Sequence, residues 1–180
     1  MLKNPVQCVF LRAQVLKFIE SGMSSTNKAV VLLGSNIRPV ENLGKAVAYL
    51  RQFAAVRSLS NIWETKAVGS NGPNFLNMAA EVETTLAMDQ FKTEVIDRIE
   101  SELKRIRTAN KNAPRTIDLD IILFNNKVLD NNLWDKAFIA IPVAEIYPDF
   151  PNPAENLTLR EIAERLKNSA FVRLYNQTKD

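Results

Sequence analysis

The chain has 180 residues, a formal net charge of +3 and 46% hydrophobic residues, so it is long enough to bury one packed core and is expected to fold as one domain. With 24% charged residues, five glycines and eight prolines, it matches neither a collagen-like nor a disordered protein. One cysteine and no histidine exclude an internal disulfide, a four-thiolate zinc site and any histidine general base. Any chemistry must therefore come from carboxylates, arginines and lysines, which suit hard cations and phosphates.

We expect a cytoplasmic protein, because the single cysteine fits a reducing compartment and the N-terminal segment is neither a secretion signal nor a membrane span. Arg12 and Lys17 interrupt the apolar residues of that segment. We therefore expect residues 1–22 to be an N-terminal extension and residues 23–180 to be a single domain that opens at a start-like Met23. The alternative is an amphipathic helix over the same N-terminal residues that packs on the domain.

The first half of the domain predicts a strand, a helix and two further strands. Residues 29–33 are a β-branched apolar run, which indicates a buried strand. Pro39 suits the first turn of a helix. The apolar face of this helix consists of Leu43, Ala46, Val47, Leu50 and Ala54. Residues 56–63 and 75–84 have the alternating pattern of extended strands.

The second half predicts a helix and a strand. Spacings of four, four, four and three residues predict one apolar stripe on a helix of about five turns. The stripe consists of Phe91, Val95, Ile99, Leu103 and Ile106. Glu100 and Lys104 are expected to pair on this helix at i,i+4. Residues 117–124 predict a strand with an acidic first half.

In order, these elements give an α+β fold, a ferredoxin-like βαββαβ sandwich whose antiparallel sheet is covered by helices on one face. A C-terminal extension follows. It contains a proline-rich stretch at 148–153 and a helix opened by Thr158, which begins a capping box with Glu161.

Two carboxylates predict a cation site on the last strand of this sandwich. Asp118 and Asp120 are two residues apart, so they leave the same face about 6.5 to 7 Å apart at the backbone. Two like charges in an apolar strand need compensation, and oxygen ligands favour Mg²⁺. The alternative is a solvated sheet edge without a metal.

A basic segment precedes the two carboxylates. Residues 98–115 hold six basic side chains against two acidic ones. Arg105 and Arg107 come at the end of the predicted helix, where its dipole favours cations, and Arg115 lies three residues before Asp118. These positions are also compatible with ordinary solvation of a helix end. Guanidinium groups beside metal-binding carboxylates favour a polyphosphate ligand.

The strand and the residues before it resemble a known family. Residues 113–124 read Ala-Pro-Arg-Thr-Ile-Asp-Leu-Asp-Ile-Ile-Leu-Phe, which resembles the specific signature of 6-hydroxymethyl-7,8-dihydropterin pyrophosphokinases. Further family-like segments follow one another in family order over roughly residues 28–150. They are Leu33-Gly34-Ser35-Asn36 with Asn42-Leu43, Trp63-Glu64-Thr65 through Gly69, Pro73 through Asn77, and Ile99-Glu100 through Arg107.

The resemblance implies an enzyme of folate biosynthesis that transfers the pyrophosphoryl group of ATP to the hydroxymethyl group of a reduced pterin and releases AMP. It implies two Mg²⁺ ions held by Asp118 and Asp120. It also implies that Arg107 and Arg115 join these carboxylates as catalytic residues and stabilise charge on the phosphates. The implied ATP contacts are Glu100, Arg105, Arg107, Arg115, Ile121 and Lys136. Glu100 has the alternative role of a surface partner for Lys104.

For the pterin, the resemblance implies a ring stacked between Phe75 and Phe138. Asn77 would bind the amide edge of the ring, and Thr65 and Val68 would line the pocket through their backbone. Core packing of Phe75 and a turn role of Asn77 are the alternatives. The expected partners are therefore a small-molecule pterin and ATP, with no nucleic acid and no membrane, and the chain is expected to be a monomer.

The chain departs from the family between the signature strand and Phe138. Family members usually carry a His-Pro dipeptide there, and this chain has no histidine. Lys136 stands where an arginine is usual, and Asn112 where a bulky aromatic is common. The alternative function is therefore a pterin- or nucleotide-binding homologue with weak or no transfer activity. An RNA-binding module of the same strand order would need exposed aromatic residues of the RNP type, which the sequence lacks.

Overall fold

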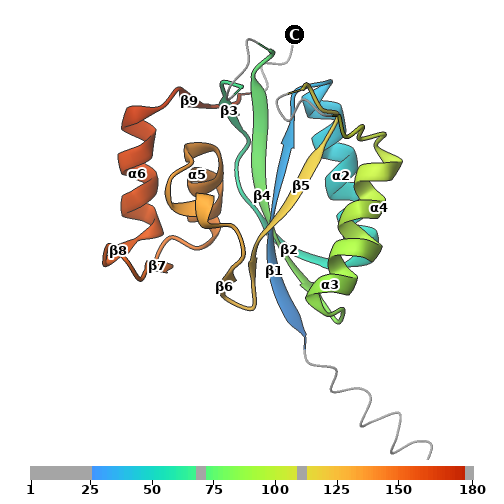
Figure 1. The fold of residues 1–180 in the computed structure, drawn as a ribbon, viewed down its shortest axis with the longest axis horizontal. Helices are drawn as coiled ribbons and strands as arrows, with labels where there is room; N and C mark the ends of the chain where they lie inside the picture. Colours follow the sequence, from blue (N-terminus) through green and yellow to red (C-terminus); the bar gives the residue numbers. More distant parts are fainter. Residues whose placement is uncertain (1–25, 68–71, 109–112, 177–180) are drawn as a thin grey trace, which may run out of the picture.

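The structure, a computed structural model, describes residues 26–67, 72–108 and 113–176. Its centre is an antiparallel sheet with the strand order β6-β5-β1-β4-β3-β9, in which β2 also pairs with β4 (Figure 1). The strands of this sheet are β1 (Asn27–Ser35), β2 (Ala55–Leu59), β3 (Trp63–Thr65), β4 (Phe75–Thr84), β5 (Asp118–Phe124), β6 (Lys127–Val128) and β9 (Val172–Leu174). A separate small hairpin pairs β7 (Pro151–Asn152) with β8 (Leu157–Thr158).

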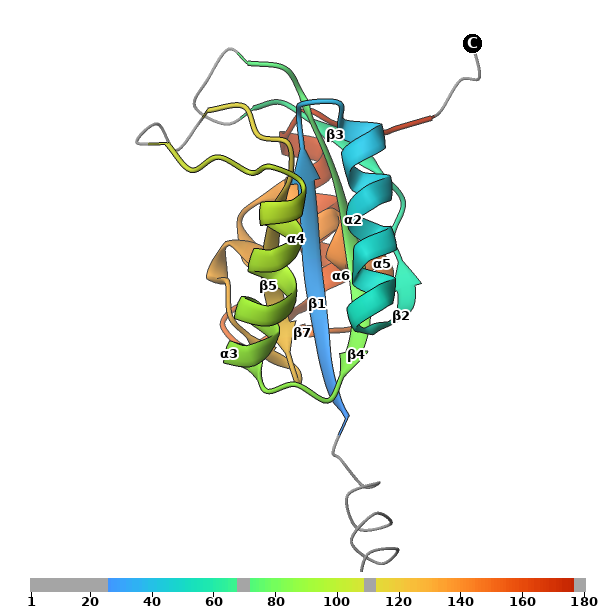
Figure 2. The same cartoon turned by 90° about the vertical axis from the view of Figure 1, so that its right-hand side faces the viewer.

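Helices cover both faces of the sheet. One layer contains α2 (Pro39–Phe53) and a continuous helical segment made of α3 (Met88–Phe91), the π-helical turn η2 (Lys92–Ile96) and α4 (Asp97–Glu102), as Figures 1 and 2 show. The other layer contains α5 (Ala137–Ile146), preceded by the 3₁₀ turn η3 (Asn131–Trp134), and α6 (Leu159–Ser169). Within the described ranges, no helix is both long and apolar enough to cross a bilayer.

The central strand β1 explains why two helical layers are needed. Its side chains alternate between two apolar clusters, with Val31 and Leu33 in the cluster under α2 and α4 and with Val30 and Leu32 in the cluster under α5 and α6. A strand that is apolar on both sides must be covered on both sides. The two helices of the βαββαβ segment lie on one face, as expected, and the C-terminal extension covers the other.

Most of the predicted strands are confirmed. The strand predicted at 75–84 is β4, and the strand predicted at 29–33 is longer at both ends. The extended segment predicted at 56–63 divides into β2 and β3, which both pair with β4. Between them, the backbone N–H of Ser60 donates to the carbonyl of Ala79 at 2.9 Å, and the Ser60 hydroxyl accepts from the Ala79 N–H at 2.8 Å. The segment between β2 and β3 therefore stays hydrogen-bonded to β4.

The helix predicted over 91–106 is shorter than expected and contains a π turn. It ends at Glu102, and Ile106 is 74% exposed instead of lying on the apolar stripe. Steps of four residues overshoot the 3.6-residue α-helical repeat, and the wider η2 turn absorbs part of that drift. Phe91, Val95 and Ile99 stay buried as a result.

The predicted capping box at the C-terminal helix is confirmed. The Thr158 hydroxyl accepts a hydrogen bond from the Glu161 backbone N–H, and the Glu161 carboxylate accepts one from the Thr158 backbone N–H at 2.7 Å. The last strand, β9, then returns to the main sheet and pairs with β3, with Val172 opposite Thr65.

Candidate active site

The register of three strands brings distant parts of the sequence into one row across the sheet. Gly34 in β1 lies opposite Asn77 in β4 on one side and opposite Asp118 in β5 on the other. Two residues earlier in β1, Leu32 lies opposite Asp120. Residues opposite one another point to the same face, and neighbouring strands are about 4.8 Å apart, so Asn77 and Asp118 are separated by about 10 Å of sheet.

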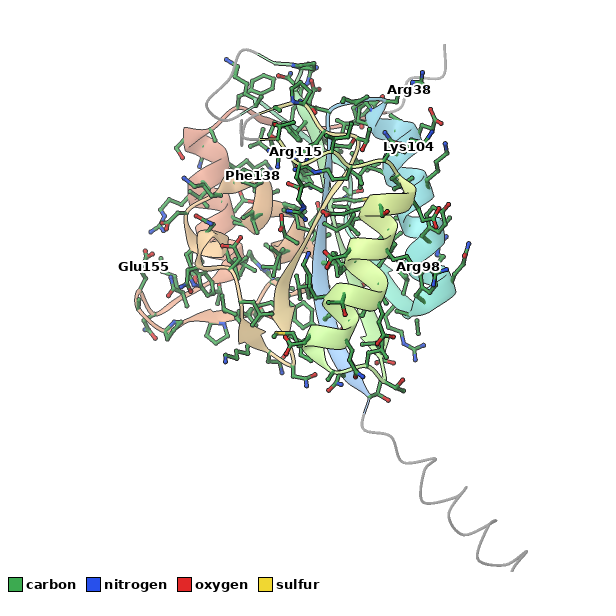
Figure 3. All side chains as sticks on the ribbon, turned by 45° about the vertical axis from the view of Figure 1, so that its right-hand side comes forward. Arg38, Arg98, Lys104, Arg115, Phe138 and Glu155 are labelled. Atoms are coloured by element: carbon green, nitrogen blue, oxygen red, sulfur yellow. The ribbon has the colours of Figure 1, made fainter. Side chains whose placement is uncertain are left out.

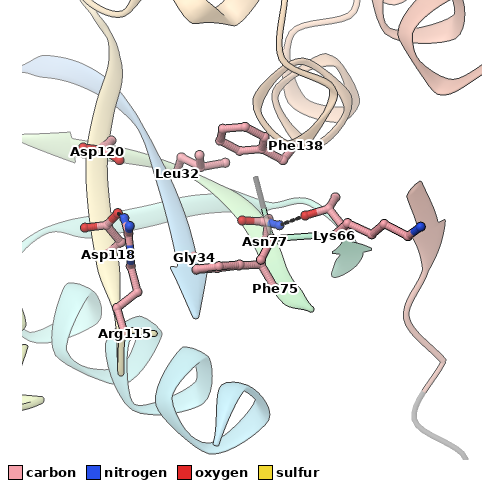
Figure 4. Close-up of a pocket in the computed structure, with 11 residues that line it drawn as sticks. Leu32, Gly34, Lys66, Phe75, Asn77, Arg115, Asp118, Asp120 and Phe138 are labelled. Carbon is pink, nitrogen blue, oxygen red and sulfur yellow. Dashed lines mark hydrogen bonds and ion pairs between the residues drawn. The ribbon is translucent and has the colours of Figure 1, made fainter. Parts of the chain in front are cut away.

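A cavity of about 200 Å³ opens over this row, under α5. Figure 4 shows the side chains that surround it, and Figure 3 shows Arg115 and Phe138 at the same end of the sheet. The cavity is lined by Leu32, Gly34, Thr65, Lys66, Ala67, Phe75, Asn77, Arg115, Asp118, Asp120 and Phe138.

Two aromatic rings and one amide form the apolar half of the cavity. Phe75 comes from β4 and Phe138 from α5, and Figure 4 shows the side chain of Asn77 at a level between them. Asn77 is 4% exposed, and its Nδ2 donates to the Thr65 hydroxyl at 2.9 Å. This bond orients the amide group of Asn77 at the wall of the cavity.

Gly34 allows the amide to lie this close to the sheet. A Cβ atom at this position would meet the Oδ1 atom of Asn77 at 3.0 Å, which is tighter than normal van der Waals contact. The absence of a side chain at Gly34 therefore favours this close approach, and its backbone angle is ordinary. The sequence placed Gly34 in a family-like segment without indicating this contact.

Asp118 is held by two arginines at the polar end of the cavity. Arg105 contacts its Oδ1 atom through two nitrogens, each at 3.4 Å, and Nη1 of Arg115 contacts its Oδ2 atom. The guanidinium group of Arg115 also lies 5.6 Å from the centre of the Phe75 ring. The arginine thus connects the charged half of the cavity with the aromatic half, in a cation–π geometry.

Asp120 is the second carboxylate of the pair and is open to solvent. Protein atoms around it in the concave surface remove part of its hydration, and together with the nearby negative charge of Asp118 they raise the pKa of Asp120 to about 6. The positive charge of Lys92 acts in the opposite direction. The two carboxylates repel each other and supply hard oxygen donors. A divalent cation bound between them would offset this repulsion.

Glu100 lies inside the protein rather than on its surface. It is 4% exposed, and its carboxylate accepts from the Leu119 backbone N–H at 3.0 Å and from Nη2 of Arg107 at 2.6 Å. The predicted pair with Lys104 is wrong, because α4 ends before Lys104 and that residue has a left-handed backbone with a φ of 56°. Glu100 therefore joins α4 to the strand that carries both aspartates and to Arg107.

A second cavity, of about 370 Å³, meets the first at Asp120. It lies between the helical segment that starts at α3 and the turn that follows β6, which are at the same end of β5 in Figure 1. Its lining residues are Met88, Asp89, Lys92, Asp120, Ile121, Leu129 and Asp130. Of the predicted ATP contacts, Ile121 lies here, and the sequence did not indicate Lys92 or Leu129.

The remaining predicted contacts lie elsewhere. Lys136 is exposed at the N-cap of α5 and lines neither of the two cavities. Arg107 is 67% exposed in its side chain and pairs with Glu100. Val68, Asn112 and the extension over 1–22 lie outside the described residues.

Comparison with known proteins points to one family. A sequence model of the family described as 7,8-dihydro-6-hydroxymethylpterin-pyrophosphokinase (HPPK) matches residues 30–148. A 2-amino-4-hydroxy-6-hydroxymethyldihydropteridine pyrophosphokinase of Bacillus subtilis (strain 168) is 40% identical over 132 residues, which cover 67% of this chain and 78% of the relative. The enzyme of the same name from Haemophilus influenzae is 28% identical over 158 residues, 81% of this chain and 97% of the relative.

Solved structures agree with this family at the level of the fold. A crystal structure of wild-type Plasmodium falciparum HPPK-DHPS with pteroate has a TM-score of 0.63 and 14% sequence identity to this chain. The match covers 79% of this chain and 42% of that longer chain. On the match over residues 30–148 and the identity to the bacterial relatives, the chain belongs to the 7,8-dihydro-6-hydroxymethylpterin-pyrophosphokinase family.

Proposed function

We propose that this chain transfers the pyrophosphoryl group of ATP to the hydroxymethyl group of 6-hydroxymethyl-7,8-dihydropterin and releases AMP, as a step of folate synthesis. The observation that carries the proposal is the row Asn77, Gly34 and Asp118, which sets a buried amide and a carboxylate about two strand spacings apart in the lining of one cavity. The family assignment and the names of the relatives support it.

The pterin occupies the aromatic half of the cavity in this proposal. Phe75 and Phe138 stack on its faces, and Asn77, oriented by Thr65, binds its amide edge. Val68 and the backbone of Thr65 complete the predicted contacts. The spacing of about 10 Å between Asn77 and Asp118 suits a bicyclic ring that directs its hydroxymethyl group toward the carboxylates.

The nucleotide lies along the second cavity and reaches the first at Asp120. Ile121 and Leu129 supply apolar contacts, and Arg105 and Arg115 are close enough to Asp118 to bind phosphate oxygens placed beside it. Glu100 acts in this scheme by holding β5 and Arg107 in place, and Arg107 and Lys136 contribute charge from the rim. The residues position and neutralise the reacting groups, which is the main requirement of phosphoryl transfer.

Asp118 and Asp120 are the proposed ligands of two Mg²⁺ ions. Both are hard oxygen donors, and the loss of hydration at Asp120, together with the negative charge of Asp118, raises the pKa of Asp120. In the part of the chain that the structure describes, no third acidic residue joins them in a metal-binding cluster, so phosphate oxygens and water would complete the coordination. Bound Mg²⁺ would neutralise phosphate charge and hold the two substrates together.

The finer features expected from the sequence belong to the same proposal. The sheet order β5-β1-β4-β3, in which β2 and β3 together take the place of the one strand expected at 56–63, supports the ferredoxin-like description, with residues 23–180 as one domain. We propose a cytoplasmic monomer that acts on small molecules and binds neither nucleic acid nor membrane. Cavities of small-molecule size over a buried amide support that choice of substrate.

The test is the identity of the nucleotide product. The full chain is incubated with Mg²⁺, ATP and 6-hydroxymethyl-7,8-dihydropterin, and AMP is expected to form in step with the pterin diphosphate. Asp118→Ala is expected to lower turnover by about a thousandfold while the circular dichroism spectrum is retained. ADP as the product would contradict the proposal. Pterin binding without any AMP would instead select the second candidate, a binding homologue, which the histidine-free connection between β5 and α5 favours.

A further inference from the structure

The charged residues that line the second cavity, where a polyanion is proposed to bind, are mostly acidic. Asp89, Asp120 and Asp130 contribute three carboxylates to it, and Lys92 is the single cation among its lining residues in the described ranges. A nucleotide carries several negative charges, so the carboxylates of the second cavity repel the nucleotide unless a cation in the cavity faces its phosphates. Of the two arginines beside Asp118, Arg115 lines the first cavity, and neither Arg115 nor Arg105 lines this one.

We propose that Lys92 is a nucleotide-binding residue of this chain, whose ammonium group binds a phosphate of the nucleotide where the two cavities meet. The inference rests on the proposed function and adds a residue that neither the family resemblance nor the names of the relatives assign. Lys92 lines the cavity that continues from Asp120, and its side chain is 40% exposed, so the ammonium group is accessible to a ligand.

The π turn explains how Lys92 is held before the nucleotide binds. The backbone N–H of Asp97 donates to the carbonyl of Lys92 across five residues, which replaces the four-residue bond of an α-helix. In an α-helix, residues five apart point about 140° away from each other. The wider turn brings the two side chains together, and Nζ of Lys92 lies 3.1 Å from Oδ1 of Asp97.

This ion pair is a weak competitor for the lysine. Both side chains are about 40% exposed or more, and pairs of this kind contribute little to stability. A phosphate group offers Lys92 a negatively charged partner inside the second cavity. The opposite wall cannot supply this charge, because the connection after β5 contributes only the apolar Leu129 and the acidic Asp130 to the cavity. The cation therefore comes from η2, a different part of the sequence.

The experiment is calorimetric titration of the full chain with Mg²⁺ and α,β-methylene-ATP, in which the bond broken by pyrophosphoryl transfer is blocked. Lys92→Ala is expected to weaken binding about tenfold, Lys92→Arg to retain most of it, and Asp97→Asn to tighten it two- to threefold by releasing the lysine. Lys45→Ala is the matched control, because Lys45 also pairs with a carboxylate on an exposed helix face, at 2.6 Å from Glu41, but lines neither cavity.

Steady-state kinetics provide the second readout. The Lys92→Ala variant is expected to raise KM for ATP and to leave KM for the pterin unchanged. Wild-type affinity in Lys92→Ala, or an equal loss in Lys45→Ala, would overturn the inference. The titration does not depend on turnover, so a chain that binds the analogue through Lys92 but forms no AMP would contradict only the proposed function.

Discussion

At the scale of single residues, the site depends on one position that has no side chain. Gly34 lies between the amide that is proposed to bind the pterin and the carboxylate that is proposed to bind metal, and it faces Asn77 across the sheet. A Cβ atom at this position would lie 3.0 Å from Oδ1 of Asn77, so the amide that bonds to Thr65 would have to shift by a few tenths of an ångström.

Gly34→Ala is therefore expected to weaken pterin binding about tenfold, since overpacking of this kind costs about 1 to 3 kcal/mol. The measurement is fluorescence titration with the pterin. Gly44→Ala is the control, because a Cβ atom at that exposed helical position meets nothing within 4 Å, and the alanine should slightly stabilise α2. Equal pterin affinity in the two variants would show that the contact between Gly34 and Asn77 is unimportant.

The raised pKa of Asp120 predicts a pH-dependent effect on stability. Its pKa moves from 3.8 to about 6 on folding, so the folded state holds more protons than the unfolded state in that window, and the free energy of unfolding falls as pH rises through it. In chelator, Asp120→Asn should therefore unfold at a higher urea concentration than the wild type at pH 7, by roughly 1 kcal/mol after allowance for solvent screening.

The same comparison near pH 4 supplies the control for Asp120→Asn. The wild-type carboxyl is then largely protonated in the folded state, so the difference in stability between the two proteins should shrink. The variant should nevertheless lose turnover at pH 7, because an amide is a poor Mg²⁺ ligand. If Asp120→Asn were no more stable than the wild type at pH 7, the inference that the charged form of Asp120 destabilises the fold would be wrong.

The residue contacts were only partly predictable from the sequence. Alternation predicts that Phe75 and Asn77 share a face, and the two-residue spacing predicts the same for Asp118 and Asp120, and both pairs do line the first cavity. Lys92 was not predicted, because its place in the second cavity depends on a π turn and on a connection far away in sequence. Spacing carries no signal for such a contact.

At the scale of elements, local signals predicted how helices begin better than how they end. The capping box at Thr158 is visible in four residues of sequence, and Pro39 marks the first turn of α2. α4 ends where Lys104 adopts a left-handed backbone and the Arg105 backbone N–H donates to the Glu100 carbonyl at 2.9 Å, while the Glu100 carboxylate bonds to Leu119 and Arg107. That contact arises only after β5 packs against the helix, so the apolar stripe alone extended the helix too far.

Thr158→Ala tests the energetic value of the cap. Loss of the hydroxyl that accepts the Glu161 N–H should destabilise the protein by about 1 kcal/mol, which for a chain of this size lowers Tm by about 2 to 4 °C. Scanning calorimetry measures the shift, and kcat should be unchanged. Thr93→Ala is the comparison, because the Thr93 hydroxyl bonds only to helix carbonyls, Asp89 and Gln90, and caps no helix end. A larger loss in Thr93→Ala would argue against the capping role.

At the scale of the whole molecule, the order of strands and helices was predictable, and the second helical layer was not. The βαββαβ order follows from periodicity, but the sequence does not say where the segment after Phe124 packs. That segment covers the apolar face formed by residues such as Val30, Leu32 and Ile122. It also contributes Phe138 to the cavity, so the layer that completes the core completes the site.

The N-terminal extension is expected to be dispensable for activity. A chain that starts at Met23 keeps all of the strands and helices described above, so its AMP production and its Tm should match those of the full chain. The comparison requires both proteins at equal concentration in the AMP assay and in calorimetry. Failure of the shorter chain to fold would favour the alternative in which the first 22 residues pack on the domain.

The position of β9 has a consequence for how the protein folds during its synthesis. It pairs with β3 beside Thr65, and Arg173 bonds to Glu64 at 2.6 Å across 109 positions of sequence. A polypeptide emerging from the ribosome therefore completes this sheet late, when residues 172–174 have left the exit tunnel and paired with β3. Nascent chains arrested before that point should carry a largely formed sheet in which the edge of β3 beside Thr65 is not paired with β9.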